Sequence, residues 1–332
     1  MRGTWGLLIG ALVASSLRVA QAEPLPCDED DRLAEAAAAL LLEGALLAAP
    51  TLMPRARAAG FDGVAVHARE STSETALRDW LATLGARGEG RLVCGEARSA
   101  SRWLVLASRR GGRLWREGER LHAALEPGFS SPSLVVEDAQ GALSTRPLSS
   151  RALREGWVLA GAPRRVQLVA ESESGPRPVA ELVLDEDARA APLAGGDAAP
   201  EAEARDETVL AALDAHRRTA GVGTLRPNRL LAESARKHAA RVCELGRLAH
   251  RVDGEDPAVR LAREHVAARG VGEAIARAGS SEAALRTLLE SPSHRLAVGR
   301  RDFTDVGVGQ GRDTRGQVCL VVLLAAWPRR AP

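Results

Sequence analysis

Residues 291–309 read SPSHRLAVGRRDFTDVGVG, and they join a helical pattern to a strand pattern around one histidine. Before this stretch, SEAALRTLLE (residues 281–290) has the apolar spacing of an amphipathic helix, which Pro292 is expected to end. After it, the alternation of Val and Gly leads into VCLVVLLAAW (residues 318–327), a continuous apolar run that is typical of a buried strand. This order predicts an α/β domain, with His294 in the loop between the helix and the sheet.

Two further helices are expected upstream of this stretch, over residues 206–221 and 227–246. In the second helix, Leu231, Ala235 and Val242 fall on one stripe, and Gly246 is a typical residue at a helix end. The glycines of VGVGQG (residues 306–311) do not open a helix and lack a Gly-Lys-Ser/Thr ending, so they do not predict a phosphate loop. Small residues in a strand that a helix approaches closely explain them better.

The C-terminal part resembles the CAP superfamily, which comprises cysteine-rich secretory proteins, antigen 5 and pathogenesis-related proteins, in its bacterial SCP-like form. The similarity covers about residues 207–328 and rests on motifs in the family order. These motifs are LDAHRRTAGVGTLRPNRLLAESARKHAARVCELGRLAHR, VGEAIA, LLESPSHR and FTDVGVG. The resemblance implies an α-β-α sandwich with a concave cleft, in which His250, Glu273 and His294 occupy the positions of the family's site residues.

The family pattern is incomplete at three positions. Ala274 stands where the family has Asn, Ser291 where many members have a second glutamate, and Leu288 where the helix tryptophan is usual. Since glycoside hydrolysis usually needs two carboxylates, we expect no catalytic residue and non-catalytic binding of a lipid, glycan or peptide ligand from the cell envelope.

Other interpretations of the cleft stay open. The resemblance leaves open whether His250 and His294 bind a divalent metal such as zinc. If they do, the alternative function is a metal-dependent hydrolase with Glu273 as base. A third interpretation is an interaction scaffold with a vestigial cleft. The two histidines could also be ordinary loop residues, and Glu273 could tie down its loop. His216, His238 and His265 are expected to be solvated or capping residues of helical segments.

The start of the chain predicts export. Residues 1–22 have the Arg2, apolar run and Ala20-Gln21-Ala22 ending of a secretory signal peptide, so a secreted or periplasmic protein is expected. No other stretch is apolar enough for a transmembrane helix. The charges are balanced, with 45 basic and 43 acidic side chains, and this composition argues against a nucleic-acid partner.

Three further regions are predicted between the signal peptide and the CAP-like domain. Residues 186–206 are rich in Ala, Pro, Gly and acidic residues and are expected to be a disordered linker. Residues 111–185 alternate strand and turn patterns, which indicates a small β-sandwich. Residues 27–110 form an α/β region in which SETALRDWL (residues 73–81) echoes SEAALRTLL (residues 281–289). This region is either a degenerate CAP-like copy without the site residues or an accident of Ala/Leu-rich composition.

The four cysteines divide two and two around the predicted linker. Three pairings are open to four cysteines, and this division favours Cys27–Cys94 and Cys243–Cys319. The alternative for Cys243 and Cys319 is a pair of buried free thiols. No Cys-x-x-Cys spacing occurs, so metal binding by cysteine is not expected.

Overall fold

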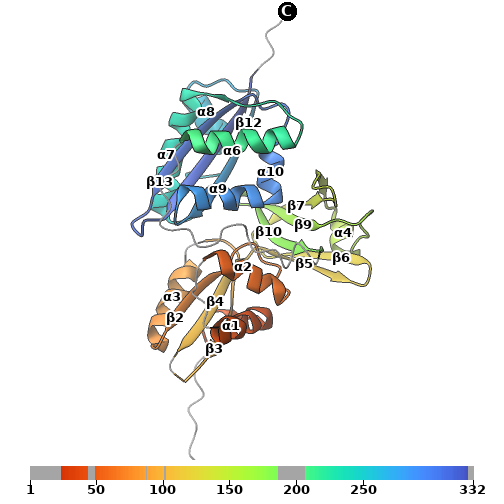
Figure 1. Ribbon diagram of the computed structural model, residues 1–332, viewed down its shortest axis with the longest axis vertical. Helices are drawn as coiled ribbons and strands as arrows, with labels where there is room; N and C mark the ends of the chain where they lie inside the picture. Colours follow the sequence, from red (N-terminus) through yellow and green to blue (C-terminus); the bar gives the residue numbers. More distant parts are fainter. Residues whose placement is uncertain (1–23, 44–48, 87, 101, 186–205, 328–332) are drawn as a thin grey trace, which may run out of the picture.

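The computed structural model describes residues 24–43, 49–86, 88–100, 102–185 and 206–327. The predicted signal peptide and nearly all of the predicted linker lie outside these ranges. Figure 1 shows three units: an N-terminal α/β unit, a middle β unit beside it, and a C-terminal α/β unit that contacts the β unit through α10. In the described part of the chain, no helix is both long enough and apolar enough to cross a membrane.

The C-terminal unit is built on a four-stranded sheet of order β11-β13-β14-β12, in which only the β11–β13 pair is parallel. Its elements are α6 (Asp206–Thr219), β11 (Arg226–Pro227), α7 (Arg229–Leu245), α8 (Pro257–Arg263), β12 (Gly270–Ala278), α9 (Ser281–Glu290), α10 (Pro292–Val298), β13 (Asp305–Arg312) and β14 (Val318–Ala326).

Helices cover both faces of this sheet. Apolar residues of α6, α9 and α10 pack on one face, and those of α7 and α8 pack on the other, so that every residue of β14 is buried. The α-β-α sandwich predicted for the C-terminus is therefore confirmed. Pro292 departs from the prediction: α9 does end before it, but Pro292 then occupies the first turn of α10, where its missing N–H needs no partner.

Glycines on β13 allow α7 to lie close to the sheet. A Cβ atom at Gly307 would lie 2.1 Å from the backbone carbon of Leu231, and one at Gly309 would lie 2.2 Å from that of Ala235. Real Cβ atoms do not approach backbone atoms so closely. The Val-Gly alternation therefore has the close-approach role that the sequence indicates.

The N-terminal unit is also a four-stranded sheet between helices, of order β1-β3-β4-β2. Apolar residues of α1 and α2 pack on one face, and those of α3 pack on the other. The elements are β1 (Asp28–Glu29), α1 (Asp31–Glu43), α2 (Ala49–Ala58), β2 (His67–Ser71), α3 (Glu74–Ala86), β3 (Arg91–Arg98) and β4 (Trp103–Arg110).

The two α/β sheets share one layout. Each has a short first strand parallel to its neighbour and two antiparallel pairs, and each places a strand that comes earlier in the chain at the far edge. The close helix approach recurs as well, because a Cβ atom at Gly95 of β3 would lie 2.0 Å from the backbone nitrogen of Ala34 in α1. The N-terminal unit thus has the layering that a degenerate copy of the C-terminal unit requires.

The middle unit packs a hairpin, β5 and β6, on a four-stranded antiparallel sheet of order β10-β9-β7-β8. Leu114 and Leu121 of the hairpin share an apolar cluster with Leu134, Leu168 and other residues of the sheet. The elements are β5 (Gly112–Glu117), β6 (Arg120–Leu125), β7 (Ser130–Glu137), β8 (Leu143–Pro147), α4 (Ser150–Glu155), β9 (Arg165–Ser172) and β10 (Gly175–Val183).

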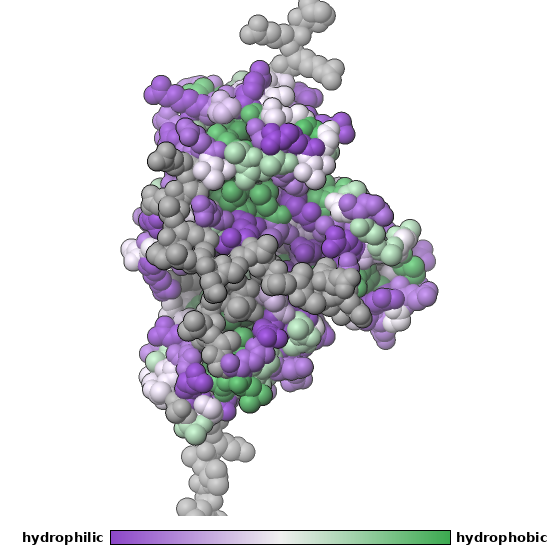
Figure 2. Space-filling view, in the orientation of Figure 1, coloured by the Kyte–Doolittle hydropathy of each residue, from purple (hydrophilic) through white to green (hydrophobic). Residues whose placement is uncertain are grey.

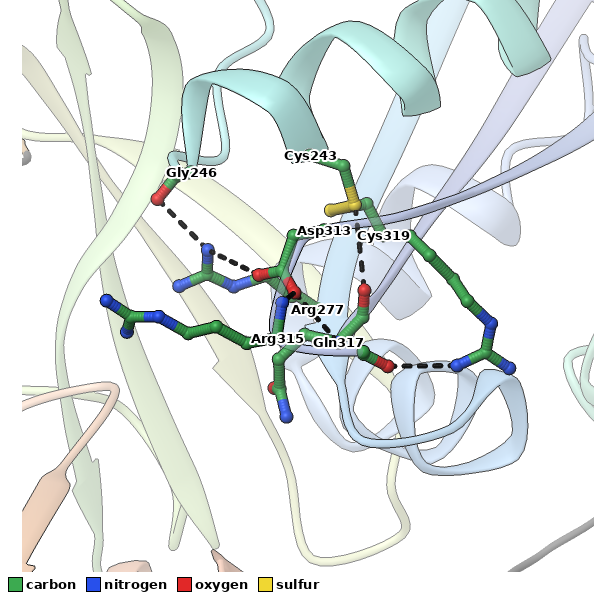
Figure 3. The surroundings of a disulfide bond; sticks show 9 residues. Cys243, Gly246, Arg277, Asp313, Arg315, Gln317 and Cys319 are labelled. Carbon is green, nitrogen blue, oxygen red and sulfur yellow. Dashed lines mark hydrogen bonds and ion pairs between the residues drawn. A yellow bond between two sulfur atoms is a disulfide. The ribbon is translucent and has the colours of Figure 1, made fainter.

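Both predicted disulfides are present, and the alternative of free thiols is wrong. Cys27 bonds to Cys94, and Cys243 bonds to Cys319. Figure 3 shows that the second bridge ties α7 to β14 beside the turn that contains Asp313, which accepts the backbone N–H groups of Arg315 and Gln317. This bridge therefore fixes the helix that packs most closely against the sheet.

We expect the Cys243→Ala/Cys319→Ala double variant to lose about 2–4 kcal/mol of stability in the C-terminal unit, because the bridge closes a loop between residues 76 positions apart. Native-state hydrogen exchange of β14 amides measures this loss. The Cys27→Ala/Cys94→Ala variant is the control and should leave β14 protection unchanged. Equal loss in the two variants would contradict the assignment of each bridge to its own unit.

Candidate functional site

Glu273 lies in the middle of the candidate site, on strand β12. Side chains alternate across a strand, so Glu273 faces the same side as Val271 and Ile275, which pack with α7 and α8. Its side chain is only 1% exposed. A buried carboxylate is costly unless it is paired, and its partners therefore define the site.

Both carboxylate oxygens of Glu273 have partners. His250 Nδ1 lies 2.9 Å from Oε1, and the Arg260 guanidinium contacts Oε2 and donates to the His250 carbonyl at 2.8 Å. Burial raises the pKa of Glu273, but the His250 hydrogen bond and the positive charges of His250 and Arg260 outweigh it, and the pKa lies below its usual range. Glu273 is therefore an acceptor, so His250 Nδ1 carries a proton that it donates to Oε1.

His238 completes the buried part of the site. It lies on α7, is 3% exposed, and its Nε2 is 2.9 Å from the carbonyl oxygen of Ala249 and 3.7 Å from Glu273 Oε1. Burial lowers the pKa of His238. The expectation of a solvated or capping His238 is therefore wrong. The signal in the sequence was its place four residues from Ser234 and Val242 on the buried stripe of α7.

His294 is the third of the predicted site residues. It lies on α10 and not in a loop as predicted, since Pro292 opens a new helical turn. Burial and the positive charge of His250 lower the pKa of His294 to about 4, so the two rings lie within electrostatic range of each other. Among the described residues, its buried Nδ1 has no hydrogen-bond partner. The structure thus places His250 in contact with Glu273, and the His294 ring within electrostatic range of His250.

The site residues do not fit a protein-held divalent metal. His250 Nε2 and the His294 ring offer two nitrogens, whereas zinc sites use three or four protein ligands. Both oxygens of Glu273 are engaged by His250 and Arg260. Within the described ranges, no three His, Cys, Asp or Glu side chains gather in an arrangement that could hold a metal ion.

The family model described as the cysteine-rich secretory protein family, CAP, matches residues 210–324. The C-terminal unit is a CAP domain. The match covers the layered unit just described and includes His250, Glu273 and His294. A search of curated proteins found no significant match.

Several solved structures are similar to this chain. An outer surface protein of Borrelia burgdorferi is 20% identical, with a TM-score of 0.35, over 37% of this chain and 92% of its own. An extracellular SCP-domain protein of Bacillus anthracis is 16% identical, with a TM-score of 0.33, over 65% of this chain and 67% of its own. A cysteine-rich secretory protein of Staphylococcus aureus is 12% identical, with a TM-score of 0.30, over 60% of this chain and 66% of its own.

The low pKa of His294 predicts a pH-dependent stability. The folded pKa is about 4 and the unfolded pKa is about 6.5, so the unfolded chain binds more protons between these values. Stability therefore falls as the pH drops from about 6.5 towards 4, and this contribution levels off below the folded pKa. We expect the wild type to lose about 1–2 kcal/mol more than His294→Asn between pH 7 and pH 5.

Urea unfolding with chelator at both pH values measures this difference, because His294→Asn removes only the titrating group. His265→Asn is the control, since His265 is exposed and Asn tolerates its backbone φ of 60°. The control should follow the wild type. Parallel pH profiles of the wild type and His294→Asn would contradict a His294 that is neutral because its pKa is lowered to about 4.

Proposed function

We propose that this protein is exported and that its CAP domain binds a polar cell-envelope ligand, without catalysis, in the cleft that contains His250 and His294. The observation that carries this proposal is the full engagement of Glu273 by His250 and Arg260. With both of its oxygens engaged, the Glu273 carboxylate has no free oxygen with which to act as a general base.

A general base needs a free oxygen within reach of the proton that it removes. Glu273 has neither a free oxygen nor a raised pKa, because His250 and Arg260 hold its charged form. The position of the second family carboxylate is Ser291, whose hydroxyl lies 3.3 Å from Gln167 Oε1. Hydrolysis by two carboxylates has no counterpart in this arrangement.

The exposed edge of the site favours a ligand rich in hydroxyl or amide groups. His250 Nε2 can form a hydrogen bond, and the neutral His294 ring offers one donor and one acceptor, shared between its two nitrogens. Ser291 and Ser293 add hydroxyl groups beside His294. Glycan chains and peptides supply complementary groups, whereas an acyl chain would leave these polar groups unpaired. The proposal therefore favours a glycan or peptide over a lipid.

Co-sedimentation with purified peptidoglycan sacculi in the presence of chelator tests the function. We expect the wild type to bind, and the His250→Asn/His294→Asn variant to bind at least about tenfold more weakly, which corresponds to about 1.4 kcal/mol. His265→Asn is the matched control and should bind as the wild type does. Equal binding by the double variant would contradict the proposal.

The same samples test the alternative of a hydrolase. Soluble fragments released from sacculi only when divalent metal is supplied, and only with His250 and His294 intact, would replace the binding function with metal-dependent hydrolysis. Binding that needs no metal and releases no fragments would support the proposal.

A further inference from the structure

We propose that the middle β unit covers the histidine cleft within the same chain, so that the ligand and the β9–β10 turn compete for one site. This inference rests on the proposed function for the identity of the ligand, and on the contacts of the β unit for the competition. The covering turn comprises Ser172–Gly175, which joins β9 to β10.

The covering turn is bound by the CAP loop that contains His250. The carbonyl oxygen of Ser174 accepts the backbone N–H groups of His250, at 2.8 Å, and Arg251, at 2.9 Å. The Arg247 guanidinium lies 3.1 Å from Ser174 Oγ, and that of Arg251 lies 3.3 Å from the carbonyl oxygen of Ser172. The loop therefore donates at least four hydrogen bonds to this one turn.

Gly175 brings the turn into direct contact with the site. Its φ is +99°, and a Cβ atom there would lie 2.9 Å from the Cβ atom of His250. Any side chain at this position would push the turn away from His250. The turn therefore packs directly on His250 and leaves no room for a side chain at position 175.

A second contact of the β unit reaches the segment that carries His294. Gln167 Oε1, on β9, accepts the backbone N–H of Ser293 at 3.0 Å and contacts the Ser291 hydroxyl. Arg165 donates to the Glu290 carbonyl at 2.7 Å. Strand β9 therefore holds the residues just before His294 while its turn holds His250.

The junction between the β unit and the CAP domain is polar. Arg295 Nη2 lies 2.6 Å from Glu137 Oε2, and none of the apolar clusters of the described residues combines the two units. Figure 2 shows hydrophilic residues along this junction on the face that it draws. Polar interfaces of this kind are typical of units that separate reversibly. A ligand that binds only the open form then has an apparent affinity reduced by the open fraction.

A Gly175→Ala variant of the full chain tests the cover, because the added methyl group meets His250. Gly128→Ala is the matched control: Gly128 also has a positive φ, lies in the same unit, and has nothing within 4 Å of an added Cβ. The first readout is the rate at which diethyl pyrocarbonate modifies His250, mapped by mass spectrometry. The second readout is binding to purified sacculi.

If the cover exists, Gly175→Ala raises both the His250 modification rate and sacculus binding by at least about fivefold over Gly128→Ala, since the open fraction limits both. Arg251→Met removes the donor to the Ser172 carbonyl without backbone strain and should raise both readouts as well. It tests the cover if Gly175→Ala fails to fold.

Three results separate the cover from the function. An unchanged His250 rate in both opening variants overturns the cover. A raised His250 modification rate with unchanged or weaker sacculus binding would contradict the competition, because the turn and the ligand would then not share a site. A raised rate with no sacculus binding by any form supports the cover and overturns only the proposed function.

Discussion

Replacing Gly307 with alanine is expected to destabilise the CAP domain by at least about 3 kcal/mol. The added Cβ would lie 2.1 Å from the Leu231 carbonyl carbon and 2.2 Å from the Ala232 nitrogen. Both atoms belong to the backbone of α7, which cannot rotate out of the way as a side chain can. The helix must therefore move off the sheet, and its apolar contacts with β14 are lost with it.

Native-state hydrogen exchange in the CAP domain measures the effect of Gly307→Ala. Gly223→Ala is the control, because nothing lies within 4 Å of a Cβ atom there, and its stability should stay within about 0.5 kcal/mol of the wild type. Wild-type protection in Gly307→Ala would contradict the close packing of α7 on β13.

Replacing Arg260 with methionine is the second change with a large expected effect, about 3–5 kcal/mol. Methionine keeps much of the apolar stem but removes the guanidinium from Glu273, whose side chain is only 1% exposed. The carboxylate then keeps His250 as its hydrogen-bond partner and loses a full positive charge. Its pKa should rise as a result.

Arg263→Met provides the matched control on the same helix. Arg263 pairs with Glu255 at the surface, with 69% of its side chain exposed, and its loss should cost less than about 1 kcal/mol. Adding Glu273→Gln to Arg260→Met should recover part of the stability, because the unpaired charge is then gone. Equal effects of Arg260→Met and Arg263→Met in urea unfolding would contradict the buried ion pair.

Local patterns were sufficient to predict much of the CAP domain. The buried stripe of α7, the end at Gly246 and the close-approach glycines follow from spacing and residue size, and the structure confirms them. The division of the cysteines likewise predicted both disulfides. These features depend on neighbours in the sequence or on small sets of alternatives.

Features that depend on distant partners were missed. Arg260 looks like one more charge on a short helix until Glu273, 13 residues away, lies beside it. Gln167 gives no signal in the sequence, because its partner Ser293 is 126 residues away in another unit. Buried charges and contacts between units are long-range properties, so neither periodicity nor composition could reveal them.

The N-terminal unit resembles the CAP domain in its layout. Its sheet order and its Gly95 approach to α1 match those of the CAP domain. We propose that residues 27–110 are a degenerate CAP-like copy. Its consequence is that Gly95→Ala should disturb the N-terminal unit as Gly307→Ala disturbs the CAP domain.

The central claim is that Glu273 accepts the Nδ1–H of His250, and that the nearby His294 ring is neutral at neutral pH. Long-range ¹H–¹⁵N NMR of the histidine rings in ¹⁵N-labelled, chelator-treated protein tests this claim most directly, with His250→Asn and His294→Asn assigning the signals. We predict that His250 Nδ1 carries a proton and that His294 titrates near pH 4. An Nε2–H tautomer of His250, or a His294 that titrates near its ordinary value, would contradict the account.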